Sequence, residues 1–387
     1  MKINIIHMGF FYSGGGERVA LEQARFLRKR GHIVKVFSPI IYWDKCFPDL
    51  LAQVKPERLV PHLPLPFPFR EGSSMLASAI IPFGVKKVSD CDVMLCHSQP
   101  SMWLGYRVNT LFGTPYVGYL HQLTTFIHRR PDTAGEWASG GDFLLLDGLL
   151  GVFAKKLALH LDRLCHMNAS ALLFNSRWTR KLFEKEYGLT GEVCYPAVET
   201  PLKAKSSKRK NTVVIASRHY PWKRIDLAFS VLKGLRTNRP ELLVTGKETV
   251  HTKFLIDAAA KSGLSDRIRF TGYVDDATLV QMYSEARAYI QTSIQEPFGL
   301  SPVEAQLNGT PAVVWGDAGV AETVQDGRTG FHAKPYNIDD FSKKLDILLS
   351  DNSRWQAMSR NAKAWASSFN WKTHIDLLEG TLDEQRK

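Results

Sequence analysis

The chain has 387 residues, with 50 Lys and Arg against 38 Asp and Glu, which gives a formal charge of +12. Hydrophobic residues make up 44% and charged residues 23%, and these ordinary values exclude a wholly disordered or collagen-like chain. The length favours two domains over one. The basic excess indicates an anionic partner: nucleic acid, an anionic membrane or a phosphorylated ligand.

Neither a membrane span nor a metal site is evident in the sequence. No apolar run approaches the roughly 20 residues that a membrane-spanning helix needs. The apolar N-terminus, residues 1–11, is not followed by a small-residue cleavage site. The five cysteines are scattered and have no zinc-binding spacing. We therefore expect a cytoplasmic protein with reduced thiols.

The first half of the chain opens with a βαβ pattern. It predicts a strand at 3–7, a glycine-rich turn at 13–16, a helix at 17–30 and a strand at 33–38. Further strands are expected at 93–97, 116–120 and 171–175, with helices between them, including 154–167. The polar and basic segment 199–211 lacks apolar periodicity, which is typical of a linker.

After this linker the alternation of strands and helices restarts. Strands are predicted at 212–217, 242–245, 268–273, 289–292 and 312–315. Helices are predicted at 225–235, 253–261, 277–286, 300–307, 339–349, 354–368 and 371–384. The pattern indicates two α/β domains in tandem, each with a parallel sheet. A ligand would lie at the carboxyl ends of strands from both sheets.

Segment 296–304, Glu-Pro-Phe-Gly-Leu-Ser-Pro-Val-Glu, is the most informative motif. It places one carboxylate in a loop after a strand and the other near the start of a helix. Gly299 lets the backbone turn close to a ligand, and Pro302 suits a first helical turn. The N–H groups near Phe298 to Ser301 form an anion site, and Glu304 can accept hydrogen bonds from hydroxyls. Together these features predict a site for a nucleotide that carries a sugar.

On these residues the chain resembles the retaining GT-B glycosyltransferases of family 4, which carry an E-x7-E signature. Further family-like motifs lie at 14–18, 30–32, 175–177, 195–196, 217–226 and 316–331. The resemblance implies two Rossmann-like domains whose parallel sheets face a central cleft. It implies an acceptor-side domain at 1–198, a linker at 199–211, a donor-nucleotide domain at 212–370 and a C-terminal helix at 371–387 that packs back on the first domain.

The resemblance also assigns residues to the nucleotide-sugar donor. It implies donor contacts from Gly15, Gly16, Arg218, Lys223, Phe298, Gly299, Leu300, Ser301 and Glu304. A departing nucleoside diphosphate gains negative charge, which the cations of Arg218 and Lys223 would stabilise. Arg224 competes with Lys223 for this role. Glu304 would bind the ribose hydroxyls.

The same resemblance implies that Glu296, His121, Arg218 and Lys223 are catalytic. Glu296 would lie by the transferred sugar and either accept hydrogen bonds from its hydroxyls or support developing oxocarbenium charge. His121 follows a predicted strand and would contact the same sugar. The implied reaction retains the anomeric configuration and needs neither a cofactor nor a protein-bound metal. We interpret the DxD-like segment 90–92 as a chance match.

The donor and the acceptor are predicted less directly. The opening segment, segment 119–121 and the stretch from 175–176 to 195–196 look closest to mannosyltransferases, so we expect GDP-mannose as the donor, with a UDP-sugar as the alternative. The family's Gly-Gly-Pro-Glu is Gly-Val-Ala-Glu at 319–322, which leaves sugar selection open. The expected acceptor is a glycan or lipid-linked glycan in polysaccharide, lipopolysaccharide or glycolipid assembly. The cationic residues His128, Arg129 and Arg130 would meet a phosphorylated acceptor, and a solvated loop is the alternative.

The apolar run 143–153, which Lys155 and Lys156 follow, predicts contact with an anionic membrane on its cytoplasmic face, and ordinary core packing is the alternative.

Another class of protein, a non-catalytic binding or scaffold protein of the same fold, is disfavoured because the cations Arg218 and Lys223 occur together with the carboxylates Glu296 and Glu304. A dinucleotide oxidoreductase is disfavoured because the glycine turn is not GxGxxG. Nucleic acid is not expected, since no aromatic-laced basic stripe is present. The sequence predicts no oligomeric state.

Overall fold

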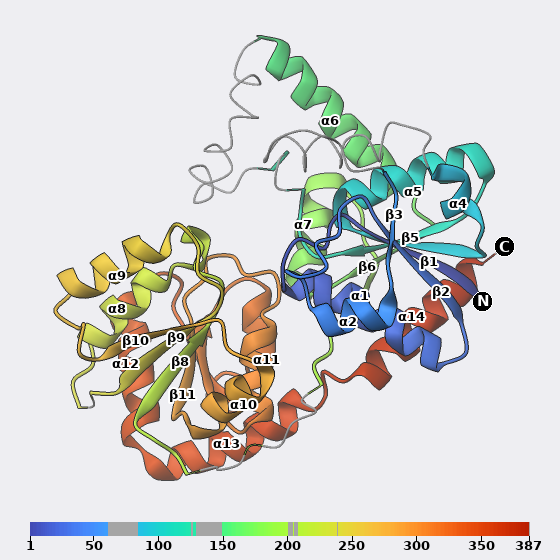
Figure 1. The fold of residues 1–387 in the computed structure, drawn as a ribbon. Helices are drawn as coiled ribbons and strands as arrows, with labels where there is room; N and C mark the ends of the chain where they lie inside the picture. The colour runs from blue at the N-terminus through green and yellow to red at the C-terminus, as the bar shows by residue number, and fades with distance from the viewer. Residues whose placement is uncertain are drawn as a thin grey trace. The chain divides into compact units, whose positions relative to one another are not determined.

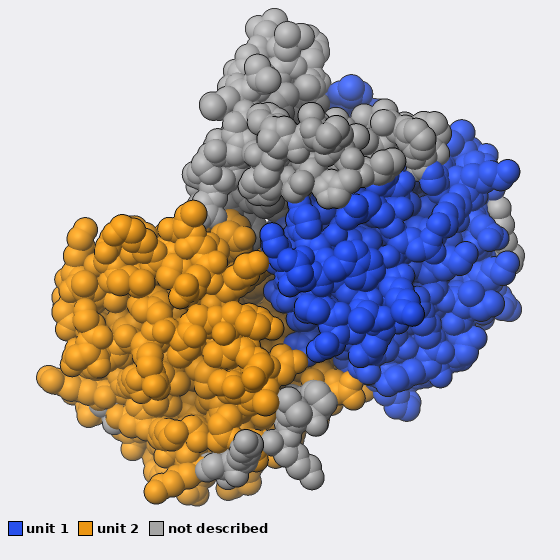
Figure 2. Space-filling view, viewed as in Figure 1, with its two compact units in different colours: residues 1–195, 371–387 blue, residues 196–370 orange. Residues whose placement is uncertain are grey.

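The structure is a computed structural model that describes residues 1–60, 84–124, 127–128, 149–199, 204, 208–237 and 239–386. For residues 149–155 it describes the backbone alone. The chain divides into two compact units (Figure 2). Unit 1 consists of Met1–Tyr195 and Trp371–Lys387, and unit 2 consists of Pro196–Asn370. Unit 1 is therefore discontinuous in the sequence.

Unit 1 is built on a parallel sheet (Figure 1). The strand order of this sheet is β3-β2-β1-β4-β5-β6-β7. Its strands are β1 (Lys2–His7), β2 (Ile33–Ser38), β3 (Glu57–Arg58), β4 (Val93–His97), β5 (Tyr116–Leu120), β6 (Ala171–Phe174) and β7 (Glu192–Val193). Its helices are α1 (Gly15–Lys29), α2 (Pro48–Val54), α4 (Val85–Ser89), α5 (Ser98–Phe112), α6 (Leu149–Met167), α7 (Arg177–Tyr187) and α14 (Trp371–Gln385).

Unit 2 is built on a second parallel sheet with the strand order β10-β9-β8-β11-β12-β13. Its strands are β8 (Thr212–Ala216), β9 (Glu241–Thr245), β10 (Ile268–Gly272), β11 (Ala288–Gln291), β12 (Ala312–Trp315) and β13 (Gly330–Ala333). Its helices are η3 (Pro221–Lys223), α8 (Ile225–Lys233), α9 (Thr252–Lys261), α10 (Asp276–Glu285), α11 (Leu300–Leu307), η4 (Gly319–Thr323), α12 (Ile338–Ser350) and α13 (Asn352–Ala366).

Both sheets reverse their strand order at one point. In unit 1 this switch point lies between β1 and β4, and in unit 2 it lies between β8 and β11. Ligands of open α/β sheets bind outside the carboxyl ends of the strands at such a point. The prediction of two Rossmann-like domains with parallel sheets is therefore confirmed, and the topology indicates where each unit would hold a ligand.

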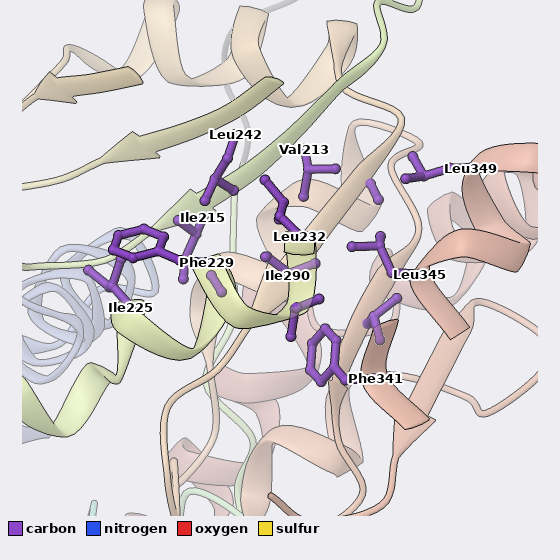
Figure 3. Close-up of a cluster of buried hydrophobic side chains, with 14 of the residues drawn as sticks. Val213, Ile215, Ile225, Phe229, Leu232, Leu242, Ile290, Phe341, Leu345 and Leu349 are labelled. Atoms are coloured by element: carbon purple, nitrogen blue, oxygen red, sulfur yellow. The ribbon is translucent and has the colours of Figure 1, made fainter. Parts of the chain in front are cut away.

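Apart from the edge strand β10, the strands of unit 2 are largely buried on both faces, as is typical of parallel strands covered by helices. In β8, Val213 and Ile215 pack in one core cluster and Val214 packs in another. Figure 3 shows the first cluster, in which Phe229 of α8 and Phe341 of α12 pack with the strand residues. Burying each such side chain contributes roughly 1.5–3 kcal/mol. These two cores fix the strand ends that carry the site.

Helix α14 completes unit 1 although it follows unit 2 in the chain. The ring of Trp371 stacks on Phe26 of α1 with centroids 4.9 Å apart. Arg30, at the end of α1, forms ion pairs with Asp376 and with Glu379, the latter at 3.2 Å. The two helices are thus held by an aromatic stack at one end and by charges at the other.

Among the described residues, no helix is both long enough and apolar enough to cross a membrane. The run 143–153, which the sequence predicts as a membrane contact, lies largely outside the described residues. Residues 143–148 are not described, and residues 149–153 are described as backbone at the start of α6.

Candidate active site

An ion pair lies at the switch point of unit 2. Glu296 Oε2, in the loop after β11, accepts hydrogen bonds from Lys223 Nζ at 2.6 Å and from Gln291 Nε2 at 3.3 Å. The side chains of Lys223 and Glu296 are 17% and 15% exposed, so salt screens them less than a pair on the open surface. The structure thus joins two predicted catalytic residues that lie 73 positions apart in the sequence.

A buried tyrosine of β11 lies close to both carboxylates of the E-x7-E segment. The hydroxyl of Tyr289 donates to Gln291 Oε1, and its ring is fully buried. Burial raises the pKa of Tyr289 above its usual range, and the charges of Glu304 and Glu296 raise it further. A hydrogen bond with the side chain of Ser301 opposes this rise. Glu296, Glu304 and the first turn of α11 therefore gather around the end of β11.

Glu304 is oriented by a second buried tyrosine. The hydroxyl of Tyr283, on α10, donates to Glu304 Oε2 at 3.3 Å. Burial raises the pKa of Tyr283 well above its ordinary value, and the charge of Glu304 adds to the effect. Tyr283 therefore stays protonated at neutral pH and is a permanent donor to this carboxylate.

The loop between the two carboxylates needs glycine at 299. Gly299 has φ 91°, in the left-handed region, and a Cβ there would lie 3.0 Å from Val320 Cγ2. The N–H of Val320 donates to the carbonyl of Glu296 at 3.1 Å, which closes the loop. Helix α11 then begins at Leu300 and Ser301 without a side-chain cap on its first N–H groups. Such uncapped groups suit an anion.

Phe298 differs from its neighbours in this loop. Its side chain is buried and meets Phe369 edge to face, with ring centroids 5.6 Å apart. Phe369 in turn meets Trp365 at 5.4 Å. The side chain of Phe298 therefore anchors the loop in the core of unit 2.

Arg218 lies in the segment that follows β8. Its guanidinium carbon is 5.3 Å from the ring centroid of Tyr220. The next residue, His219, ties this segment to the loop after β9, because its N–H donates to the carbonyl of Lys247 at 3.0 Å. Nδ1 of His219 also lies 3.0 Å from Thr252 Oγ1. The position of Arg218 thus depends on two neighbouring strand ends.

Arg224, the alternative to Lys223 as the diphosphate-binding cation, has a different partner. Its guanidinium donates to both carboxylate oxygens of Asp226, from Nε to Oδ1 at 3.1 Å and from Nη2 to Oδ2 at 3.0 Å. Lys223 reaches Glu296 instead. The geometry therefore favours Lys223 as the cation of the candidate site.

In unit 1 the glycine-rich turn lies against two histidines. Gly15 and Gly16 are the first residues of α1, and their N-cap, Gly14, provides no side-chain capping bond. A Cβ at Gly16 would lie 3.8 Å from His7 Nε2 and 3.9 Å from His121 Cε1 and Nε2. The start of α1 thus meets the ends of β1 and β5, where the sequence predicts sugar contact by His121.

Four histidines gather at this end of the unit 1 sheet; His7, His97 and His374 are buried, and His121 is partly exposed. Burial lowers the pKa of His7 to about 3 and the pKa of His121 and His374 to about 4, and it holds the pKa of His97 well below its ordinary value. The histidines also disfavour one another's charge. All four are therefore neutral at neutral pH. His374 comes from α14, where its Nε2 lies 2.9 Å from Gln23 Nε2.

His128 lies at the end of a buried polar network. Its Nε2 is 2.6 Å from the hydroxyl of Tyr187, which donates to Asp162. Asp162 is fully buried and also accepts from Gln99 Nε2 at 2.7 Å. The structure thus brings His128 to α6 and α7. Arg129 and Arg130, predicted with it as acceptor contacts, lie outside the described residues, and this role stays a prediction.

No group of three or more His, Cys, Asp or Glu side chains in the described part of the chain could hold a metal ion.

Several residues of the two sites are not predicted by the sequence analysis. They are Tyr283, Tyr289, Gln291, His7 and His97. Three of them share a signal: His7, His97 and Gln291 are polar residues that end buried strands beside a switch point. The two tyrosines give no such signal, because they occupy ordinary core positions.

Two family models match the chain, one in each half. The model described as Glycosyltransferase Family 4 matches residues 13–202, and the model described as Glycosyl transferases group 1 matches residues 199–365. The two halves are glycosyltransferase domains. The group 1 match includes the Lys223–Glu296 pair, and the family 4 match includes His97 and His121 of the histidine cluster.

Curated relatives match these glycosyltransferase domains in part. A D-inositol 3-phosphate glycosyltransferase of Nocardia farcinica is 36% identical over 117 residues, which are 30% of this chain and 26% of the relative. A glycogen synthase of Mycobacterium tuberculosis is 32% identical over 148 residues, 38% of this chain and 36% of the relative. The chain spans between about a quarter and just under half of the length of such relatives.

Solved structures match the whole chain. A HepE structure from Anabaena, in complex with UDP and glucose, has a TM-score of 0.77 and 22% identity, covering 99% of this chain and 100% of that one. A sucrose-phosphate synthase of Thermosynechococcus elongatus has a TM-score of 0.79 and 17% identity, with 100% and 98% coverage. These likenesses establish the GT-B fold.

Proposed function

We propose that the chain is a retaining hexosyltransferase that moves a sugar from a nucleoside-diphosphate sugar to a hydroxyl of a glycan or lipid-linked glycan. The observation that supports this most is the linked set of Lys223, Glu296, Gln291 and Tyr289 at the switch point of unit 2. It places a cation, an oriented carboxylate and the uncapped start of α11 at one strand end. This combination suits a sugar attached to a diphosphate.

The proposed reaction breaks the bond between the anomeric carbon and the diphosphate oxygen and forms a bond to the acceptor oxygen. The acceptor's proton passes to the departing phosphate. Arg218, Lys223 and the first N–H groups of α11 stabilise the charge that grows on the diphosphate. Glu296 supports the positive charge that develops on the sugar ring, and Glu304 binds the ribose hydroxyls. In this proposal the fixed cations act in place of a metal.

Two donors are candidates. The mannosyltransferase-like segments of the sequence favour GDP-mannose. A UDP-sugar is the second candidate, because a neighbour in fold is described in complex with UDP-glucose. The two differ in the base, so binding of the nucleotides alone can distinguish them.

The first experiment is a thermal-shift panel of GDP, UDP, ADP and their sugars. Saturation at a hundredfold excess over Kd stabilises the native state by about 2.7 kcal/mol, which a melting curve resolves. Stabilisation by GDP and GDP-mannose alone supports the first candidate, and stabilisation by UDP-sugars alone overturns it. No response to any nucleotide contradicts the proposed function.

The second experiment measures nucleotide release with the stabilising donor, with and without EDTA. Glu296→Gln keeps the size of the side chain but removes its charge, so we expect turnover to fall while the donor still stabilises the protein. The rate of the unaltered chain should be unchanged by EDTA. A protein that binds donors without releasing nucleotide would instead belong to the non-catalytic alternative.

The proposed lipid-linked acceptor implies contact with a membrane. Helix α6 exposes Leu157 and Leu161 near the basic residue Lys156, a mixture that suits an anionic lipid surface. We expect the protein to float with anionic vesicles at low salt and less so with neutral ones. Absence of flotation with either would contradict the membrane contact and leave a soluble glycan as the acceptor.

A further inference from the structure

His97 and His121 share one hydrogen bond at the end of the unit 1 sheet. His97 Nδ1 lies 3.1 Å from His121 Nε2, and the two rings are stacked with centroids 5.3 Å apart. His97 ends β4, and its register partner on β5 is Tyr119, two residues before His121. The contact is thus built into the pairing of two buried strands.

Each of the two rings is neutral, because burial lowers both pKa values far below neutrality. A neutral imidazole carries one ring proton, on Nδ1 or on Nε2. The shared bond therefore has two arrangements. Either His97 Nδ1–H donates to His121 Nε2, or His121 Nε2–H donates to His97 Nδ1.

The far nitrogen of His97 decides between these arrangements. Its Nε2 is buried and has no hydrogen-bond partner among the described residues. In the second arrangement this nitrogen would carry a proton and become a buried donor without an acceptor, which native structures rarely contain. In the first arrangement, His97 Nε2 carries no proton and is an unpaired acceptor, which protein interiors tolerate better than an unpaired donor. The first arrangement is therefore favoured, and it leaves the proton of His121 on Nδ1.

The Nδ1 atom of His121 can reach a ligand. It has no partner in the described part of the chain, and it is not among the buried nitrogens. The backbone of His121 is held on both sides, since its N–H donates to Ser98 Oγ at 3.1 Å and its carbonyl accepts from Asn175 Nδ2 at 2.9 Å. The backbone that carries the ring is thus held by neighbours other than the ligand.

We propose that His97 is a positioning residue that holds His121 as the Nδ1–H tautomer, so that His121 presents a hydrogen-bond donor to an oxygen of the substrate. This inference rests on the proposed function for the identity of the substrate, a nucleotide sugar. The tautomer itself is a property of the unliganded protein and is measured without any reaction.

The test uses the full chain labelled with 15N-histidine and long-range proton–nitrogen correlation spectra, with His121→Gln to assign the signals of His121. In the unaltered protein we expect His121 to show a proton on Nδ1 and a bare Nε2. A proton on Nε2 of His121 overturns the proposal, whether or not any variant folds.

Two substitutions at 97 form a matched pair. His97→Asn keeps an N–H near the place of Nδ1, and we expect it to preserve the tautomer of His121. His97→Phe keeps a ring without a donor, and we expect the proton of His121 to redistribute between both nitrogens. Equal spectra for the two variants would contradict a role for the His97 donor.

The rate of sugar transfer from the nucleotide sugar that the thermal-shift panel identifies gives an independent measurement. We expect His97→Phe to lower kcat by about tenfold to a hundredfold, as loss of the partners that orient metal-binding histidines does, and His97→Asn to recover most of it. Equal loss in both variants counts against the proposal. Absence of turnover in the unaltered chain would overturn the proposed function alone, because the spectra still decide the tautomer.

Discussion

The two switch points of this protein have the same topology but opposite electrostatics. At the end of β11, unit 2 joins Lys223 to Glu296 in a partly exposed ion pair. At the ends of β1, β4 and β5, unit 1 gathers His7 and His97, which are buried, and His121, which is partly exposed; all three are neutral. Under the proposed function, charges suit the diphosphate and neutral donors suit the uncharged sugar.

Burial explains how the two sites keep these characters. In unit 2, each charge has an opposite charge beside it and some access to water, which suits a charged pair. In unit 1, the imidazoles have one another as neighbours and are shielded from water, so protonation is penalised twice. The same fold thus supports a charged site and a neutral site because different residue types end its strands.

Removing the cation should have the largest effect. Lys223→Ala takes away the positive charge that would face the leaving diphosphate, so we expect kcat to fall by about 10²- to 10³-fold. Arg224→Ala should lower kcat less than tenfold, because Arg224 is engaged by Asp226. The rate of nucleotide release at two salt concentrations tests both variants, and substitution of the exposed Lys253 by Ala is the control. A larger loss for Arg224→Ala would reverse the assignment.

As the pH is lowered, unit 1 should lose stability before unit 2 does. The folded pKa of His121 and His374 is about 4 and that of His7 about 3, against about 6.5 in an unfolded chain. Folding of unit 1 therefore excludes protons, and its stability is full above pH 6.5 and is lost as the pH falls toward 4. Over that pH range, each of these histidines lowers the free energy of unfolding of unit 1 by up to about 1.4 kcal/mol for each unit by which the pH falls.

Hydrogen exchange followed by mass spectrometry, corrected for intrinsic rates, measures this difference in the intact chain. Unit 1 peptides should lose protection at a higher pH than those of unit 2, where burial lowers the pKa of His219 and His251. Substituting the exposed His160 by Gln should leave the profile unchanged. Loss of protection in unit 2 first would contradict the contrast between the sites.

A smaller effect is expected at the glycine of the unit 2 loop. Gly299→Ala places a side chain at φ 91° and 3.0 Å from Val320, whereas Gly263→Ala has φ 73° with nothing within 4 Å. Both substitutions strain the backbone by roughly 1–2 kcal/mol. In urea unfolding, the free energy of unfolding of unit 2 should therefore fall further for Gly299→Ala than for Gly263→Ala. Equal losses would mean that the loop can move away from Val320.

The fold was accessible from the sequence because its strands are apolar runs separated by helical periodicity. Strand β8 illustrates this, since Val213 to Ile215 are all apolar and all buried. Strand β13 was missed because Gly330–Ala333 is short and contains a glycine and a histidine. Its place in the sheet comes from pairing with β12, which no local pattern encodes.

The candidate site was predictable only where residues are near in sequence. Segment 296–304 shows its two carboxylates and its glycine directly. The choice of Lys223 over Arg224 depends on which side chain reaches Glu296, 73 positions away, and two adjacent cations give no local reason to prefer one. The His97–His121 contact likewise needs the strand register that places β4 beside β5.

Helix α14 links the histidine cluster to the order in which the protein is synthesised. His374 and Trp371 contact α1, yet they leave the ribosome after the whole of unit 2. At roughly 5–20 residues per second, residues 1–195 wait on the order of ten seconds or more for their last helix. During that time Phe26 and Gln23 of the nascent chain lack their native cover, so unit 2 has the opportunity to fold before the unit that precedes it.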